Sequence, residues 1–416
     1  MYISTEIYEE KENIIPNLDG TVVEIDSIAS NIICSSEWMD LFETVLCYVD
    51  DDLSYLLYEP KYKSIIDHFI NDFFSSEFPD LYEDNMKTIS HLISLAIDYY
   101  FSFIIAPRSS LHTETSEQCG AADIIKHLIK KDQHEQKTEE WHQYRHNLIT
   151  ASNAWKILDS SCNVNSFILG KCKPVEVRKQ GSFNLSTPFH WGVKYEPLSV
   201  LLYEYLYETA ITDFGCIQHD EHKFLGASPD GINTKCNNPL FGRMLEIKNI
   251  VNRDITGIPK KEYWVQMQIQ MEVCNLNFCD FLECRFQEYA LSEDFFADGS
   301  FTHTSTGSMK GCILQFCIGD KPVYAYAPFQ CSEQEYEVWC NGRLTEHADK
   351  EFIKTIYWHL DEYSCVLVKR NKHWFNAIVS QLEAVWNTIQ HERVHGYEHR
   401  ESKKRKVEEN VVFSVI

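Results

Sequence analysis

The chain has 416 residues, a net charge of −24 and a hydrophobic content of 44%. This length suits two or three domains with a buried core, and the composition excludes a disordered or fibrous protein. The net acidity argues against a general nucleic-acid-binding protein. By count, however, residues 1–136 carry about −18 of this charge, whereas residues 139–285 are nearly balanced.

The N-terminal region is predicted to be mainly helical. Apolar residues recur at helical spacing in Tyr62–Phe74 and Ile89–Ile105. The most apolar long stretch, Thr88–Ala106, contains a His, an Asp and several Ser, so we expect a buried helix rather than a membrane span. The acidic residues of segment 1–26 do not fit a cleavable leader. The cysteines are odd in number and form no Cys-x-x-Cys, which indicates reduced, mostly buried thiols in an intracellular protein.

Composition divides the chain into five predicted segments. Residues 107–120 are rich in Ser, Thr and Glu and contain no aromatic residue, which is typical of a linker. The predicted segments are an acidic, mainly helical domain at 1–107, a linker at 108–138, a compact core at 139–290, a further part of the same domain at 291–390 and a charged, partly disordered tail at 391–416.

From residue 139 onward, helix and strand signals alternate, which predicts an α/β fold with a mixed central sheet flanked by helices. Pro is tolerated in the first turn of a helix, so one helix is expected to begin just before Pro197. The expected helices are about Pro197–Glu208, Lys261–Asn275 and Trp374–Ile389. The expected strands are Gly215–His219, Lys223–Ala227, Met244–Ile250 and Asp280–Phe286, with further strands in 310–330 and 354–370.

Two short strings carry most of the chemistry, Ser228-Pro-Asp-Gly231 and Leu245-Glu-Ile-Lys248. Positions i and i+2 of a strand share a face, so Glu246 and Lys248 point the same way from an otherwise apolar strand. The Pro-Asp-Gly turn can bring Asp230 beside Glu246. Separately, these residues are a common turn and a common solvated strand edge. Together they predict a hard-cation site suited to metal-assisted hydrolysis of a phosphodiester.

Other polar residues recur near these strings. Glu196 is expected in the first turn of its helix, where the dipole favours a carboxylate whether or not a metal is present. Tyr263, Gln266 and Gln270 share one helix face, where amides can hold a phosphate or a metal-bound water, or can simply be surface residues. Two of these, Gln270 and Tyr263, are also candidates for contacting a nucleic-acid substrate.

An upstream segment, Trp141–Leu158, is predicted to form a helix, a turn and a second helix that begins at Ser152. Arg145, together with Ser152 as the N-cap, would make an anion pocket. The alternative is an ordinary helix corner with a capping serine.

The ordered set Trp141…Arg145…Thr150-Ala-Ser152, Gly192-x-x-x-Glu196, Ser228-Pro-Asp-Gly, Leu245-Glu-Ile-Lys and Gln266…Gln270 resembles the phage lambda exonuclease, or YqaJ-type viral recombinase, family of the PD-(D/E)xK nucleases. The resemblance covers residues 139–290. It implies a PD-(D/E)xK nuclease core with a helical N-terminal extension. The aromatic C-terminal block also resembles the alkaline exonucleases of large insect DNA viruses such as baculoviruses.

The resemblance implies roles for individual residues. Asp230 and Glu246 would bind Mg²⁺, with Mn²⁺ as a substitute. The carbonyl of Ile247 and the carboxylate of Glu196, directly or through water, would complete the metal site.

The remaining implied roles concern catalysis and the DNA end. Lys248 would orient and help deprotonate the attacking water, or neutralise charge in the transition state. Gln266 would steady the site. Arg145, Ser152 and Arg253 would hold the 5′-phosphate of the DNA end.

The implied activity is Mg²⁺-dependent digestion of double-stranded DNA ends from the 5′ end, in viral recombination, replication or genome processing. A protein that coats or anneals single-stranded DNA is the expected partner, and family members can assemble as homo-oligomers. Lys403–Lys406 is either a signal for import into a host nucleus or a solvated basic tail of a cytoplasmic protein. Two alternatives stay open: an endonuclease of the same superfamily, and a non-catalytic acidic scaffold in a DNA-processing complex.

Overall fold

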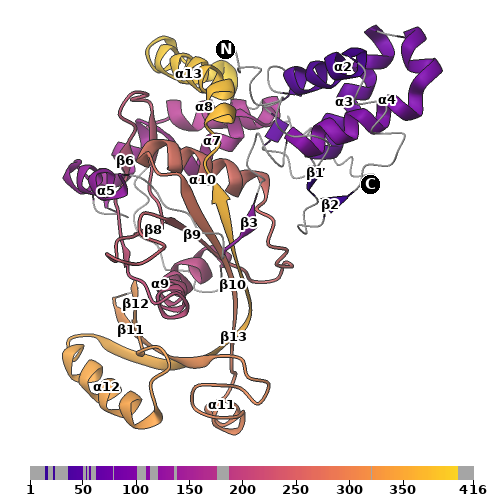
Figure 1. Ribbon diagram of the computed structural model, residues 1–416. Coiled ribbons are helices and arrows are strands. Elements are labelled where there is room, and N and C mark those ends of the chain that lie inside the picture. The colour runs from indigo at the N-terminus through magenta and orange to yellow at the C-terminus, as the bar shows by residue number, and fades with distance from the viewer. Residues whose placement is uncertain are drawn as a thin grey trace, which may run out of the picture. The chain divides into compact units, whose positions relative to one another are not determined.

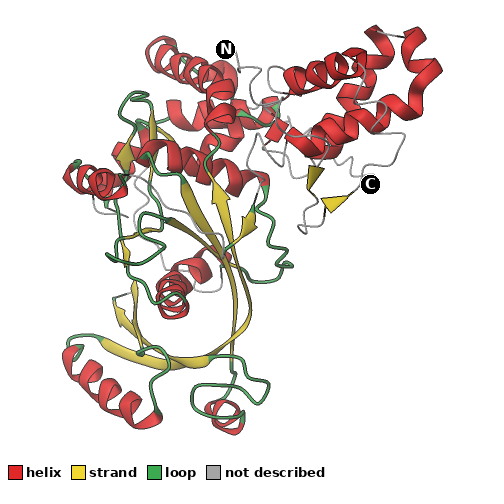
Figure 2. Cartoon of the chain, in the orientation of Figure 1, coloured by secondary structure: helices red, strands yellow, loops and turns green. Residues whose placement is uncertain are grey.

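The computed structural model describes residues 15–16, 22–23, 36–49, 53, 56–57, 62–77, 79–100, 109–112, 120–134, 138–175, 187–319 and 321–401. The chain forms two compact units, Met1–Ala106 and Pro107–Ile416. The first unit consists mainly of helices, and the second combines helices with strands (Figures 1 and 2).

The first unit is helical, as predicted. Its elements are the short hairpin β1 (Ile15–Pro16) and β2 (Val22–Val23) and the helices α2 (Ser36–Tyr48), α3 (Tyr62–Glu77) and α4 (Pro79–Tyr99). Ile66, Ile70 and Phe74 follow one another at helical spacing on α3 and are fully buried. The apolar stretch expected to be a buried helix lies partly in α4. None of the helices in the described segments is long and apolar enough to cross a membrane.

The second unit is built on an eight-stranded sheet. Its order is β12-β11-β13-β10-β9-β8-β5, and β3 pairs with β13. Only β9 and β10 are parallel to each other, and the intervening helix α10 makes the crossover that a parallel pair requires. The strands are β3 (Ser110–Leu111), β5 (Ile211–Thr212), β8 (Gly231–Asn233), β9 (Met244–Asn249), β10 (Phe278–Glu288), β11 (Lys310–Ile318), β12 (Lys321–Tyr326) and β13 (Glu351–Lys369).

A small second sheet and a set of helices complete this unit. The sheet has the order β4-β7-β6, from β4 (Ile149–Thr150), β7 (Leu225–Ala227) and β6 (Ile217–Gln218). The helices are α5 (Ala121–Lys130), α6 (Glu139–His146), α7 (Ala151–Ala154), α8 (Ser161–Cys172), α9 (Pro188–Leu206), α10 (Lys261–Cys274), α11 (Ser292–Ala297), α12 (Glu333–Glu346) and α13 (Lys372–His395), with the 3₁₀ turns η5 (Trp155–Ile157) and η6 (Glu398–Arg400). The predicted α/β class with a helical N-terminal extension is confirmed.

Helices α9 and α10 lie on opposite faces of strand β9. Leu245 and Ile247 pack into a buried cluster with Tyr195, Leu198 and Leu202 of α9. Strand alternation turns the residue between them, Glu246, toward the other face, where it contacts α10. Figure 1 shows α9 inside the curve of the long strands β10 and β13, with α10 on the far side of the sheet beside α7.

The predicted linker at 108–138 contains two elements of regular structure, β3 and α5, so it is not a linker at those residues. Strand β3 pairs with Val366–Leu367 of β13, and α5 buries Ile125 and Leu128. A polar composition did not reveal these elements, since a two-residue strand can be specified by its partner strand alone. Residues 113–119 and 135–137 lie outside the described residues.

The helix predicted to begin just before Pro197 is also wrong at its start. Helix α9 begins at Pro188, where the hydroxyl of Thr187 accepts the N–H of His190 at 3.1 Å. Pro197 therefore lies inside the helix, where it removes one backbone hydrogen bond. The hydroxyl of Tyr326 donates to the carbonyl of Lys194 at 2.6 Å, three residues before this proline.

The charged tail predicted at 391–416 begins later than expected. Helix α13 continues to His395, and Arg400 of η6 donates to the carboxylate of Glu392. The basic run Lys403–Lys406 lies outside the described residues. All thirteen cysteines in the described part of the chain are free thiols, as predicted, but only six of them are buried, so the thiols are not mostly buried.

Candidate active site

The two strings singled out in the sequence form one hairpin. Gly231 of β8 pairs with Leu245 of β9, so Asp230 lies at the end of β8 beside the centre of β9. The Oδ2 atom of Asp230 accepts the N–H of Ile247 at 2.7 Å. A Cβ atom at Gly231 would lie 2.1 Å from Cγ2 of Ile211, so glycine is required there for β5 to approach β8. The turn thus fixes Asp230 against the strand that carries Glu246.

Glu246 is fully buried and is held by three donors. Gln266 Nε2 donates to its Oε1 at 2.7 Å, and Gln270 Nε2 donates to its Oε2 at 2.7 Å. The ammonium of Lys248, two residues along the same strand face, donates to Oε1 as well. Gln270 also donates to the carbonyl of Ser228 at 3.4 Å. The amides of α10 therefore connect the two strings.

The electrostatics of this group are those of a cation site. Burial and the neighbouring Glu246 raise the pKa of Asp230 well above its ordinary value, and Glu196 adds to this, although Lys248 and the N–H of Ile247 oppose it. Burial opposes the charge of Lys248, but the carboxylates of Glu246 and Asp230 more than offset it and raise the pKa of this amine. Lys248 therefore stays protonated, and crowded carboxylates gain stability from a bound cation.

The donor set fits a hard divalent ion. Carboxylate oxygens are the ligands that Mg²⁺ and Ca²⁺ prefer. In addition, the Oε1 atom of Gln270 is buried without a hydrogen-bond partner in the described structure, which leaves an oxygen available to a metal-bound water.

Glu196 is not in the first turn of its helix, so the expected dipole stabilisation does not apply. It lies in the middle of α9, half-buried, where its charge raises the pKa of Asp230 and of Tyr326. Within the described residues, Asp230, Glu246 and Glu196 do not bring three ligand atoms within 4.8 Å of one another. Glu196 therefore acts on Asp230 through its charge at longer range.

Another group of potential metal ligands, His112, Asp280 and Cys365, does bring its ligand atoms within 4.8 Å of one another. Asp280 is already neutralised, since its Oδ1 accepts from Arg243 at 3.0 Å and its Oδ2 accepts from Tyr203 at 2.5 Å. A buried arginine disfavours a cation at the same carboxylate. We therefore assign this cluster to the structural core.

The structure brings together Arg145 and Ser152, the two residues predicted to form an anion pocket. The guanidinium of Arg145 donates to Oγ of Ser152 at 3.2 Å and to Oγ of Ser228 at 3.1 Å, and it stacks on Trp141 at 4.3 Å from the ring centroid. Ser152 was predicted to be an N-cap, and this prediction is wrong. Helix α7 begins at Ala151, and its N-cap residue is Thr150. The hydroxyl of Ser152 instead points to Arg145.

Two further cations beside Arg145 were missed by the sequence reasoning. Lys171 donates to the carbonyls of Arg145 and Leu148 at 2.7 and 2.6 Å, and Arg393 donates to the carbonyl of Lys171 at 2.9 Å. Burial, with Arg145 and Arg393 nearby, lowers the pKa of Lys171 to about 7. Among the described residues, these three cations donate hydrogen bonds to uncharged acceptors, and none of the three pairs with a carboxylate.

Two of these cations, Arg145 and Lys171, border a cavity that an anion could enter. Its volume is about 310 Å³, and its lining includes His142, Arg145, Asn153 and Lys171. An anion bound there would restore the charged state of Lys171. Ser228 was missed as a pocket residue because it was read only as part of the turn around Asp230, and Arg393 gave no signal because it lies far away in the sequence.

The structure does not bring Arg253 into this pocket. Its guanidinium pairs with Glu283 and lies 5.7 Å from the ring centroid of Tyr263. Lys248 lies 4.9 Å from the same ring, so Tyr263 separates two cations beside the carboxylates. The prediction that Gln270 contacts DNA is wrong, because its side chain is fully buried behind Glu246.

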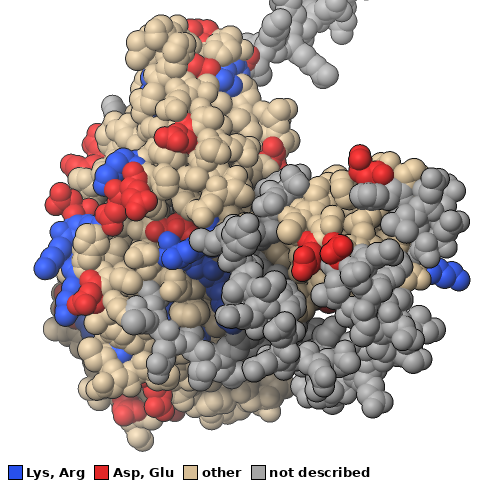
Figure 3. Space-filling model, turned by 45° about the horizontal axis from the view of Figure 1, so that its top comes forward, with Lys and Arg blue, Asp and Glu red and all other residues tan. Residues whose placement is uncertain are grey.

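One face of the second unit has mixed charge. Figure 3 shows Lys and Arg side chains interspersed with acidic ones on one face of the second unit, rather than a continuous acidic surface. The net acidity of the chain therefore does not exclude a polyanionic substrate here.

Comparisons with known proteins agree with the predicted family. Residues 140–277 match the model of the YqaJ-like viral recombinase domain. An uncharacterised protein of Acanthamoeba polyphaga mimivirus is 29% identical over 312 residues, which cover 66% of this chain and 55% of that protein. The chain thus spans about half the length of this curated relative. The family match includes all candidate site residues except Arg393.

Two solved structures are also similar. One is an alkaline exonuclease, LHK-Exo, from Laribacter hongkongensis, with 17% identity and a TM-score of 0.37 over 62% of this chain and 95% of that chain. The other is a phage-related exonuclease from Haemophilus somnus, with 12% identity and a TM-score of 0.33 over 59% of this chain and 94% of that chain.

Proposed function

Because residues 140–277 match the model of the YqaJ-like viral recombinase domain, we propose that this chain is a metal-dependent deoxyribonuclease that digests double-stranded DNA from the 5′ end. The observation that carries the proposal is the buried carboxylate of Glu246, held by Lys248, Gln266 and Gln270 and electrostatically coupled to Asp230. A protein that only bound DNA would gain nothing from burying two carboxylates beside a lysine.

Asp230 and Glu246 would hold Mg²⁺ or Mn²⁺, with the carbonyl of Ile247 and, at longer range, Glu196. The bound ion would lower the pKa of a water molecule and polarise the phosphate oxygens. Gln266 and Gln270 orient the carboxylate of Glu246, so its position does not depend on the ion. These residues supply a rigid frame for the ion and the attacking water.

In this proposal, Lys248 acts as a positive charge and not as a general base. Its amine remains protonated beside Glu246 and Asp230, so it can stabilise the negative charge that develops on the phosphate in the transition state. Of the two roles that the family resemblance implied for this lysine, we propose neutralisation rather than proton abstraction.

The cation cluster of Arg145, Lys171 and Arg393, with the hydroxyls of Ser152 and Ser228, would bind the terminal 5′-phosphate. Ser228 stands two residues before Asp230, so a phosphate bound to Arg145 would lie close to the metal ligands. Such a pocket measures position from the strand end, which distinguishes an exonuclease from an endonuclease.

Digestion of one strand from the 5′ end leaves a 3′ single strand. A partner that coats or anneals single-stranded DNA would receive it, and a homo-oligomer could keep the enzyme on its substrate. In a virus, this activity would serve recombination, replication or genome processing in the host nucleus or cytoplasm.

The proposal is tested with the intact chain and three substrates. Linear duplex labelled at its 5′ or 3′ ends should lose the 5′ label first, with Mg²⁺ and not with EDTA. Closed circular duplex should remain intact. Cutting of the circle would favour an endonuclease, and the absence of any hydrolysis would favour a scaffold.

Replacing Arg145 by Ala should reduce digestion of 5′-phosphorylated ends by about 10- to 100-fold, because charge-assisted hydrogen bonds contribute roughly 1.5–3 kcal/mol. Digestion of 5′-hydroxyl ends should change little. The measurement is the ratio of kcat/KM for the two ends. As a control, Arg285→Ala removes an arginine that pairs with Asp361 and Glu362 outside this pocket. An equal loss on both ends would contradict the assigned phosphate pocket.

A further inference from the structure

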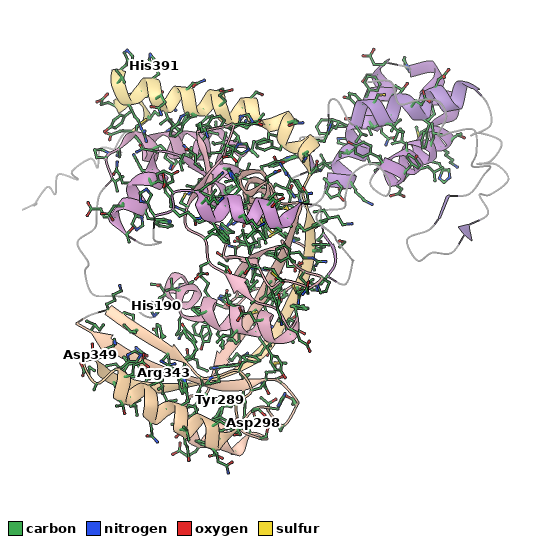
Figure 4. All side chains as sticks on the ribbon, turned by 60° about the vertical axis from the view of Figure 1, so that its left-hand side comes forward. His190, Tyr289, Asp298, Arg343, Asp349 and His391 are labelled. Atoms are coloured by element: carbon green, nitrogen blue, oxygen red, sulfur yellow. The ribbon has the colours of Figure 1, made fainter. Side chains whose placement is uncertain are left out.

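A second cavity lies where the beginning of α9 faces the outer strands of the large sheet. Its volume is about 560 Å³, within the usual size of small-ligand pockets. His190, Trp191 and Lys194 line it from α9, Tyr324 from β12 and Lys354 from β13. Figure 4 labels His190 at the start of α9, next to these strands.

The cavity combines aromatic faces with one uncompensated positive charge. Lys194 is neutralised by Glu288 and lies 4.5 Å from the ring centroid of Trp191. The Nε2 atom of His190 is 2.6 Å from the hydroxyl of Tyr324, and burial, with Lys194 nearby, lowers the pKa of this histidine. Lys354 is exposed, and no ion pair is recorded for it among the described residues.

These features fit a nucleotide. Nucleobases stack on aromatic side chains, and a lysine at the rim neutralises a backbone phosphate. Two apolar side chains at the rim, Val251 and Ile353, are 46% and 45% exposed. Such exposure suits contact with the faces of unpaired bases.

The cavity lies beside the candidate active site. The amide of Asn249, next to Lys248, donates to the carbonyl of Gly192 on the helical turn that lines the cavity. Asn249 is the register partner of Cys284 on the parallel strand β10. Glu288, which lines the cavity, lies four residues further along β10. At about 3.3 Å per residue, this separation is roughly 13 Å.

The cavity and the Arg145 pocket lie on opposite sides of β9. The cavity is on the side of α9, whose residues pack against Leu245 and Ile247. The Arg145 pocket is next to α7, which packs against α10 on the side that Glu246 faces. A strand with its 5′-phosphate at Arg145 and its scissile phosphate at Lys248 would reach the cavity in the 3′ direction by passing the end of β9, where Asn249 contacts Gly192.

We propose that the cavity between α9 and strands β12 and β13 binds a nucleotide of the digested strand, on the 3′ side of the bond that is cut. The base would lie against Trp191 and Tyr324, and the backbone phosphate would contact Lys354. This assignment rests on the proposed nuclease function for the direction of the strand. At about 3.4 Å per nucleotide, the cavity is reached roughly four nucleotides beyond the scissile phosphate.

The test measures binding without cleavage. Fluorescence anisotropy with 5′-phosphorylated single-stranded oligonucleotides of 2–10 residues is recorded in Mg²⁺, with Lys248→Ala present in every variant. Binding should tighten once the oligonucleotide exceeds about five residues. Lys354→Glu should remove this gain and weaken binding of long oligonucleotides about tenfold, while dinucleotides bind unchanged.

Matched variants separate the cavity from general effects. Lys321→Glu changes an exposed lysine of β12 outside the cavity lining and should leave the length dependence unchanged. Tyr324→Phe keeps the aromatic ring and should bind as the parent does, whereas Tyr324→Ala should not. Equal weakening by Lys354→Glu and Lys321→Glu, or binding that does not depend on length, would overturn the assignment.

The nuclease proposal can fail separately. If the chain with Lys248 intact hydrolyses no DNA in Mg²⁺ or Mn²⁺, the proposed function is wrong. The length dependence of binding and its loss in Lys354→Glu would still report whether the cavity takes a nucleotide.

Discussion

Lys248→Ala should lower kcat for Mg²⁺-dependent digestion of duplex DNA by about 10²- to 10³-fold, the usual cost of removing one group that stabilises charge in a transition state. The amine donates to the carboxylate of Glu246 and remains protonated, because the charges of Glu246 and Asp230 raise its pKa. Because this charge is needed for the transition state more than for binding, the affinity for DNA should change little. Steady-state digestion and anisotropy binding measure the two effects.

Two companion variants make this result specific. Lys248→Arg keeps the positive charge and should retain more activity than Lys248→Ala. Lys235→Ala removes an exposed lysine from the loop of the same hairpin and should digest DNA as the parent does. Digestion by Lys248→Ala at the parental rate would exclude the assigned role of this residue.

The hairpin was predictable because its geometry is local. Spacing of two residues places Glu246 and Lys248 on one strand face, and the Pro-Asp-Gly turn returns Asp230 to the same strand. The shared face of Gln266 and Gln270 follows in the same way from helical spacing. Sequence alone could therefore place these side chains together, although it could not say that Gln270 is buried behind Glu246.

Features that depend on distant partners were not predictable. The start of α9 is an exception, because its signals are local: Thr187 caps the helix and Pro188 follows, but Pro197 was mistaken for the first-turn residue. Arg393 of α13 donates to the carbonyls of His146 and Lys171 beside Arg145, and no local pattern indicates these contacts. Strand β3 exists because β13 is there to pair with it. In the last two cases, tertiary contact overrides the local signal.

A second variant with a large expected effect is Arg243→Met, which should reduce the free energy of unfolding by about 3–5 kcal/mol. Arg243 is 2% exposed and pairs with Asp280, which is 0% exposed. Removing the guanidinium leaves a buried carboxylate whose remaining side-chain partners among the described residues are the hydroxyl of Tyr203 and the imidazole of His112. Urea denaturation of the full chain at neutral pH measures the loss.

The companion variant Asp280→Asn in the Arg243→Met background tests the cause. Asn removes the buried negative charge and keeps a side chain that can bond Tyr203 and His112, so the double variant should recover most of the lost stability. A double variant no more stable than Arg243→Met would mean that packing by the arginine matters more than its charge.

Arg243 also donates to the carbonyl of His112 at 3.2 Å, and the ring of His112 stacks on Tyr207. The ion pair therefore fixes segment 109–112 to β10, the strand parallel to the one that carries Glu246 and Lys248. Loss of stability in Arg243→Met should accordingly be accompanied by faster proteolysis near His112.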